Sequence, residues 1–150
     1  MLFGMPDVTL VLAGCLALLN LWLGIRVGQV RRSEKVSVGD GGNERVVRRM
    51  RAHANFTENA WLIFALVLAI EYAVGSSIWL WIAAGLFVVA RIGHALGMDG
   101  WSAGRGAGIA VTFMLELVLG IWAISIPLTA HADRAGPVTE PVTQAVMPAG

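Results

Sequence analysis

Long apolar blocks, separated by short polar connections, dominate the hydropathy pattern of this chain. The blocks predict four membrane-spanning helices, over about residues 8–25, 44–74, 78–96 and 105–128. The second block is unusual, because it begins with the strongly polar segment 45–59 and continues without a break into almost wholly apolar sequence. Read as one helix, it starts in water and ends in lipid.

The connections between the blocks carry turn signals. The run Gly-Asp-Gly-Gly-Asn at 39–43 predicts a flexible turn, with Asn43 as the N-cap of the second helix. Gly-Ser-Ser at 75–77 predicts a tight turn before the third helix. Pro127 is expected to end the fourth helix, and the tail 129–150 is expected to be disordered. We therefore expect one four-helix membrane domain over residues 1–128.

Composition supports this all-α integral membrane class. The chain is 57% hydrophobic and only 14% charged, with a mean hydropathy of +0.70, whereas a soluble domain is nearer half apolar and a quarter charged. Its single cysteine, Cys15, excludes an internal disulfide and lies within the first apolar block, where we expect a buried and inert thiol.

The distribution of basic residues predicts the orientation in the membrane. Residues 26–51 contain eight of the eleven lysines and arginines, and Arg91 and Arg105 flank the connection between the third and fourth helices. The positive-inside rule places both basic connections in the cytoplasm and both termini outside.

Polar side chains gather where the predicted helices enter the membrane at the cytoplasmic surface. Arg51, Asn55 and Glu58 fall at i, i+4 and i+7, so they share one face of the second helix, and Arg91 and His94 share a face of the third. A surplus of positive charge at a partly dehydrated site suggests an anionic ligand. Glu58 beside the arginines suggests that this ligand also carries an ammonium group.

Less specific interpretations stay open for these residues. Arg51, Asn55 and Glu58 could form a polar network that joins helices, and His94 could donate to a backbone carbonyl. The flanking basic residues are interpreted as topology signals that contact lipid head groups: Arg26, Arg32, Lys35, Arg45 and Arg49.

The remaining polar residues give no sign of a metal site or a nucleophilic triad. The three histidines lack HxxxH spacing, so no metal is expected. Glu116 shares a face of the fourth helix with Thr112 and is expected to be protonated or hydrogen-bonded inside the bundle. Glu71 is interpreted as an interfacial residue near the outer surface.

Four of these features resemble one known family. Segment 51–58, RAHANFTE, resembles the RAxxNxxE signature of the MAPEG proteins, the membrane-associated proteins in eicosanoid and glutathione metabolism. GQVR at 28–31, RIGHA at 91–95 and Arg105 at the start of the last span are similar to further family features. The resemblance covers about residues 8–128. The run at 39–43 looks like the bacterial branch, which implies a location in the bacterial inner membrane.

The resemblance implies a homotrimer of four-helix subunits that binds glutathione between neighbouring subunits at the cytoplasmic side. Arg105 would be the catalytic residue, holding the thiol as thiolate for attack on a small lipophilic substrate from the bilayer, as in a glutathione transferase or peroxidase. Membrane lipids are further expected partners, and nucleic acid is not. Carried over by position, the remaining binding residues would be Arg31, Arg51, Asn55, Glu58 and Arg91, with His94 beside them.

Two departures from the family pattern keep other functions open. Met98 and Asn59 stand where many members have tyrosine, and Tyr72 is placed near the opposite surface. Because some members bind lipids without catalysis, a non-enzymatic lipid-binding or small-ligand-binding protein is an alternative. A small four-span transporter, with Glu116 or Glu71 as the coupling acid, is a third hypothesis.

Overall fold

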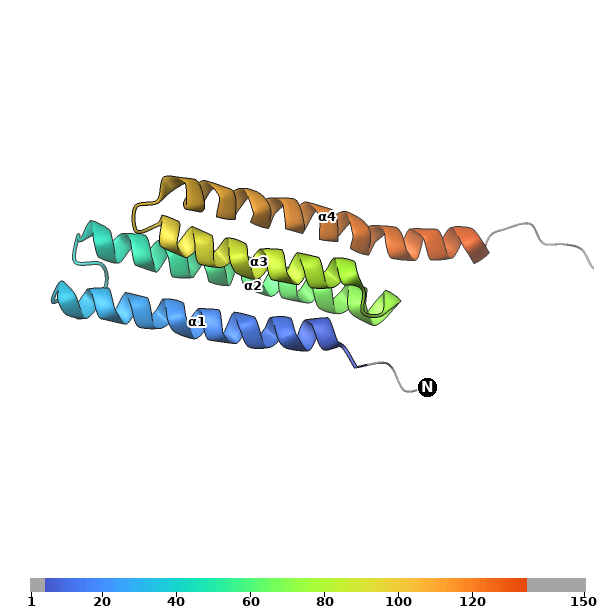
Figure 1. Ribbon diagram of the computed structural model, residues 1–150, viewed down its shortest axis with the longest axis horizontal. Helices are drawn as coiled ribbons and strands as arrows, with labels where there is room; N and C mark the ends of the chain where they lie inside the picture. Colours follow the sequence, from blue (N-terminus) through green and yellow to red (C-terminus); the bar gives the residue numbers. More distant parts are fainter. Residues whose placement is uncertain (1–4, 135–150) are drawn as a thin grey trace, which may run out of the picture.

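Four helices run side by side in a bundle, α1 (Asp7–Ser33), α2 (Glu44–Val74), α3 (Ile78–Gly97) and α4 (Ser102–Arg134) (Figure 1). They come from a computed structural model that describes residues 5–134. All four helices are long and apolar enough to cross a membrane, which confirms the predicted all-α membrane class. The α1–α2 and α3–α4 connections lie together at one end, here called the connection end, and the α2–α3 turn lies at the opposite end with the start of α1.

Two helices extend beyond the apolar blocks. α1 continues for eight residues past Ile25, the last residue of the predicted span, and α4 continues through Pro127 to Arg134. This corrects the prediction that Pro127 ends the fourth helix. The proline removes one backbone donor, the one that would bond to the carbonyl of Ala123, and the helix continues past it. Residues 129–134 are thus helical, and the rest of the predicted tail lies outside the described residues.

Local sequence signals account for the ends of α2 and α3. The Asn43 side chain accepts from the backbone nitrogens of Arg45 and Val46, which confirms the predicted N-cap. Gly75 adopts φ 82°, a conformation that favours glycine, and Ser77 caps α3 by accepting from the backbone of Leu80. These devices fix where the polar connections stop and the apolar helices begin.

Apolar side chains from all four helices fill the interior. Leu12, Ile63, Phe87 and Leu119 are among the buried residues, while many large apolar side chains face outward, as expected for contact with lipid. Cys15 was expected to be buried but is only partly buried, because it lies beside, rather than within, the stripe of α1 that contains Leu12.

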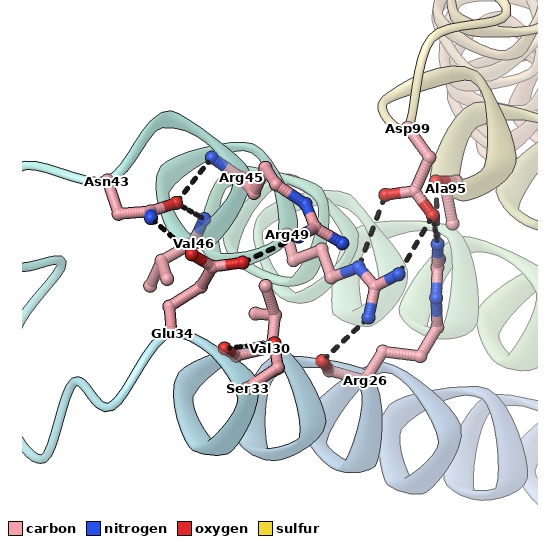
Figure 2. A network of polar contacts seen from close by, with 10 residues as sticks. All are labelled: Arg26, Val30, Ser33, Glu34, Asn43, Arg45, Val46, Arg49, Ala95 and Asp99. Carbon is pink, nitrogen blue, oxygen red and sulfur yellow. Dashed lines mark hydrogen bonds and ion pairs between the residues drawn. The ribbon is translucent and has the colours of Figure 1, made fainter.

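At the connection end, Asp99 ties three elements together (Figure 2). Its carboxylate accepts from Arg26 of α1 and, at 3.2–3.3 Å, from Arg49 of α2. Arg26 also donates to the carbonyl of Ala95 and stacks 4.7 Å above the Trp22 ring centroid, and Arg49 donates to the carbonyl of Arg26. We call Arg26, Arg49 and Asp99 the Asp99 clasp.

The clasp corrects the interpretation of its arginines as lipid contacts. Arg26 is only 7% exposed, and both guanidinium groups bond within the protein. Burial raises the pKa of the Asp99 carboxyl, but hydrogen bonds and charges from Arg49 and Arg26 outweigh it and hold the pKa below its ordinary value. Arg45 is likewise paired, with Glu34 at 2.6 Å, although its side chain stays 70% exposed.

At the opposite end, Glu71 caps a helix that has no side-chain cap of its own. Its carboxylate accepts from the backbone nitrogens of Val8 and Thr9 at 3.0 and 2.8 Å, and from the hydroxyls of Thr9 and Ser76. Glu71 is only 4% exposed, so its carboxylate is buried between the helices at this end of the bundle. A carboxylate at a helix N-terminus satisfies free backbone donors and complements the helix dipole.

We expect Glu71→Gln to destabilise the bundle by about 2–3 kcal/mol, because an amide cannot accept from all these donors and turns its own NH₂ toward some of them. Denaturant unfolding in detergent micelles measures the loss. Glu44→Gln is the matched control, since it removes the same charge from the same helix at a side chain that is 76% exposed. Its cost should stay below about 1 kcal/mol, and equal losses for the two variants would contradict the capping role.

Candidate functional site

A cavity of about 340 Å³ opens near the connection end between α2, α3 and α4. We call it the Arg51–Arg105 pocket. It brings together five of the side chains predicted from the sequence. α2 contributes an arginine, an amide and a carboxylate, and α3 and α4 contribute one of the five each. The pocket is lined by Arg51, Ala54, Asn55, Glu58, His94, Met98, Arg105 and Ile109.

Helical spacing explains this convergence. Arg51, Asn55 and Glu58 fall on one face of α2, as the sequence predicts, and Arg105 lies in the first turns of α4. The wall also contains Ile109, which the sequence analysis did not single out. Its position four residues after Arg105 places it on the same face, so helical periodicity was the available signal.

Three charged side chains at the pocket are not used by the fold. Arg51, Glu58 and Arg105 are exposed, and no ion pair or side-chain hydrogen bond engages them within residues 5–134. The arginines of the Asp99 clasp, by contrast, are bonded inside the protein. The pocket therefore presents two cations and one anion that are free to meet a ligand.

Arg91 lies behind the pocket rather than in its wall. It is only 2% exposed, and it donates to Asn55 Oδ1 at 2.8 Å and more weakly to Thr112 Oγ1 at 3.4 Å. Because Arg91 occupies the amide oxygen of Asn55, the amide nitrogen is the part of that side chain left to donate to a ligand. Arg91 is thus placed to orient a pocket residue.

Glu116 interacts electrostatically with Arg91. The sequence had suggested a protonated or hydrogen-bonded carboxyl, and Glu116 Oε1 is buried without a hydrogen-bond partner among the described residues. In its ionised form the carboxylate and the guanidinium would each reduce the cost of burying the other.

The last two predicted residues, His94 and Arg31, occupy contrasting positions. His94 lines the pocket and is 3% exposed, and its Nδ1 makes no hydrogen bond in the described part of the chain, so that nitrogen does not donate to a backbone carbonyl. Arg31 lies on α1, outside the pocket, and contacts the sulfur of Met50 at 3.5 Å. In a single chain it does not reach the other candidate residues.

The described residues contain no group of three or more His, Cys, Asp or Glu side chains placed to hold a metal ion. The pocket offers charged and amide groups to a ligand. Arginines bind carboxylates through charge-assisted hydrogen bonds, and a glutamate accepts from an ammonium group.

Comparison with known families gives one match. The model of the MAPEG family matches residues 9–125, from the first turns of α1 well into α4. No curated protein matches the chain.

The pairing of Arg91 with Glu116 can be tested by a double-mutant cycle. Arg91→Leu should cost about 1–3 kcal/mol of unfolding free energy, because it removes the hydrogen bonds to Asn55 and Thr112 and the electrostatic partner of Glu116. Adding Glu116→Leu should recover about 1 kcal/mol or more of that loss. Denaturant unfolding in detergent measures all four proteins of the cycle, and strictly additive losses would show that the two groups are not coupled.

Proposed function

The chain belongs to the MAPEG family, and we propose that it binds glutathione in the Arg51–Arg105 pocket and transfers it to lipophilic electrophiles in the membrane. Family membership supports a membrane function related to glutathione or eicosanoid metabolism in general. The observation that carries the specific proposal is the presence at one pocket of three charged groups that the fold leaves unpaired.

The charges of the pocket complement those of glutathione. The tripeptide has two carboxylates, one ammonium group and a thiol. Arg51 and Arg105 suit its anionic groups, Glu58 suits the ammonium, and the free amide nitrogen of Asn55 is a further donor to a carboxylate. The volume of the pocket also falls in the range of about 300–1,000 Å³ that is typical of small-molecule sites.

Arg105 is our candidate for activating the thiol. A fixed positive charge favours the thiolate over the thiol, and a pKa lowered by ~2 units corresponds to ~2.7 kcal/mol of differential stabilisation. The thiol proton leaves to solvent, and the thiolate then forms a carbon–sulfur bond with an electrophilic carbon, whose electron pair passes to the leaving group. Met98 and Ile109 give the pocket an apolar part beside this charge.

We further propose that the protein assembles as a homotrimer in the bacterial inner membrane with both termini outside. The connection end carries most of the basic residues, so this orientation follows the positive-inside rule. The family resemblance places Arg31 at the binding site, and since it does not line the pocket of its own chain, a contribution from a neighbouring subunit would reconcile the two.

A second function, ligand binding without transfer, is favoured by one observation. Met98 lines the pocket at the position where many catalytic members have tyrosine, so no phenol there assists the thiol. The transporter hypothesis receives less support, because both of its candidate acids have other roles. Glu71 caps α1, and Glu116 lies near the charge of Arg91.

Glutathione binding can be measured by titration calorimetry on the solubilised protein. We expect Arg51→Ala and Glu58→Ala each to weaken binding about tenfold or more, since each removes a charged partner of the ligand. Arg45→Ala is the matched control, because it removes an arginine of the same helix that pairs with Glu34 away from the pocket. If the folded wild-type protein binds no glutathione, the proposed function is wrong.

Conjugation of glutathione to a generic electrophile separates the two functions. We expect Arg105→Gln to lower the rate by about tenfold or more at neutral pH and to shift the pH profile upward, because less of the bound thiol ionises. Arg32→Gln, which removes an exposed charge at the same end of the bundle, is expected to leave the rate unchanged. A wild-type protein that binds glutathione without conjugating it would favour the second function.

A further inference from the structure

The α3–α4 connection, residues 98–101, touches both the Asp99 clasp and the Arg51–Arg105 pocket. Met98 lies in the pocket wall, and Arg105 follows in the first turn of α4. Asp99, the residue after Met98, is bonded instead to α1 and α2 (Figure 2). We propose that Asp99 is a positioning residue, which holds this connection so that Arg105 stands at the bound thiol. This proposal rests on the proposed function.

The clasp bonds the α3–α4 connection to α1 and α2, the two helices that this connection does not join. Arg26 reaches from α1 to both the Asp99 carboxylate and the carbonyl of Ala95 near the end of α3. Arg49 reaches from α2 to both carboxylate oxygens and to the carbonyl of Arg26. The carboxylate therefore fixes the connection with respect to α2, the helix that also carries Arg51 and Glu58.

Close backbone packing links the connection to Arg105. A Cβ atom added at Gly97 would lie 2.2 Å from the backbone nitrogen of Arg105 and 2.8 Å from its Cα. A Cβ added at Gly104 would lie 2.3 Å from the Trp101 ring, and the Arg105 nitrogen donates to the carbonyl of Trp101. With no space between these atoms, a displacement of the connection has to move the Arg105 backbone as well.

Asp99→Asn gives the proposal a test whose sign is decisive. The substitution removes a negative charge, so a purely electrostatic effect would favour the thiolate and lower the pKa of the bound thiol. Release of the connection would instead move Arg105 from the thiol and raise that pKa. The two explanations therefore predict opposite shifts of the pH profile.

We expect two results from Asp99→Asn in the full-length protein. Hydrogen exchange of the amides of residues 98–105 should quicken in the ligand-free protein, because the clasp loses its charged acceptor. The ultraviolet absorbance of bound glutathione thiolate should titrate at higher pH, with about threefold less thiolate at a given pH below the pKa. Asp40→Asn is the control, since it removes the same charge from the α1–α2 connection, where its carboxylate bonds only to the Gly42 nitrogen in the described structure. It should leave both measurements unchanged.

A second pair of variants leaves the charge unchanged, and only one of the two is expected to move the backbone of Arg105. Gly97→Ala forces a methyl group against Arg105 and should also raise the thiol pKa. Gly93→Ala, one turn earlier, would meet only the Gly104 carbonyl at 3.9 Å and should match the wild type. If Asp99→Asn does not fold, Arg49→Gln tests the clasp by exchange, because it leaves the Arg26 half in place.

The outcomes separate this proposal from the proposed function. Wild-type exchange rates at residues 98–105 in Asp99→Asn, or a thiol pKa that falls, would overturn the positioning role. Absence of glutathione binding by the wild type would overturn the proposed function and, with it, the role of Asp99 toward a thiol. In that case, faster exchange would still show that Asp99 holds the connection.

Discussion

A guanidinium group buried inside a bundle that faces lipid has to find its partners within the protein, and this constraint organises the centre of the structure. Arg91 is 2% exposed and bonds to Asn55 on α2 and Thr112 on α4, with Glu116 interacting electrostatically. A buried guanidinium that lost these partners would be left unsatisfied, at a large cost in free energy. Arg91 therefore fixes how α2, α3 and α4 meet, and it fixes the orientation of the Asn55 amide at the pocket.

The need of buried polar groups for partners within the protein also acts at both ends of the bundle, and the pocket differs from these ends. Glu71 satisfies the free donors at the start of α1, and Asp99 satisfies Arg26 and Arg49 at the connection end. These charged groups of the fold are thus paired across helices. At the Arg51–Arg105 pocket, by contrast, Arg51, Glu58 and Arg105 make no ion pair within residues 5–134. Unpaired charge at the entrance to a membrane is costly unless a ligand or another subunit meets it, so the pairing pattern makes this pocket the candidate site.

The sequence was sufficient for features that depend on one helix. Hydropathy predicted four spans, and the spacing of Arg51, Asn55 and Glu58 predicted the face that lines the pocket. It was insufficient for features that depend on two helices. Arg26 and Arg49 have the composition of lipid-facing topology signals, and only the fold brings Asp99 to them from 73 and 50 residues away. The capping role of Glu71 was not predicted for the same reason, because Val8, whose backbone nitrogen donates to it, is 63 residues distant. Helical periodicity gives the direction of a side chain from its own axis, but it does not identify the helix on the other side.

The polar start of α2 faces the Asp99 clasp on one side and the pocket on the other. Successive residues of a helix are rotated by about 100°, so Arg49 and Arg51 point to nearly opposite sides of α2. Arg49 is bonded to Asp99 and the end of α1, and Arg51 is unpaired at the pocket. One short segment thereby anchors the α3–α4 connection on one side and presents a candidate ligand contact on the other. Its many arginines are not equivalent, because the direction of each side chain decides whether the fold uses its charge or leaves it exposed at the pocket.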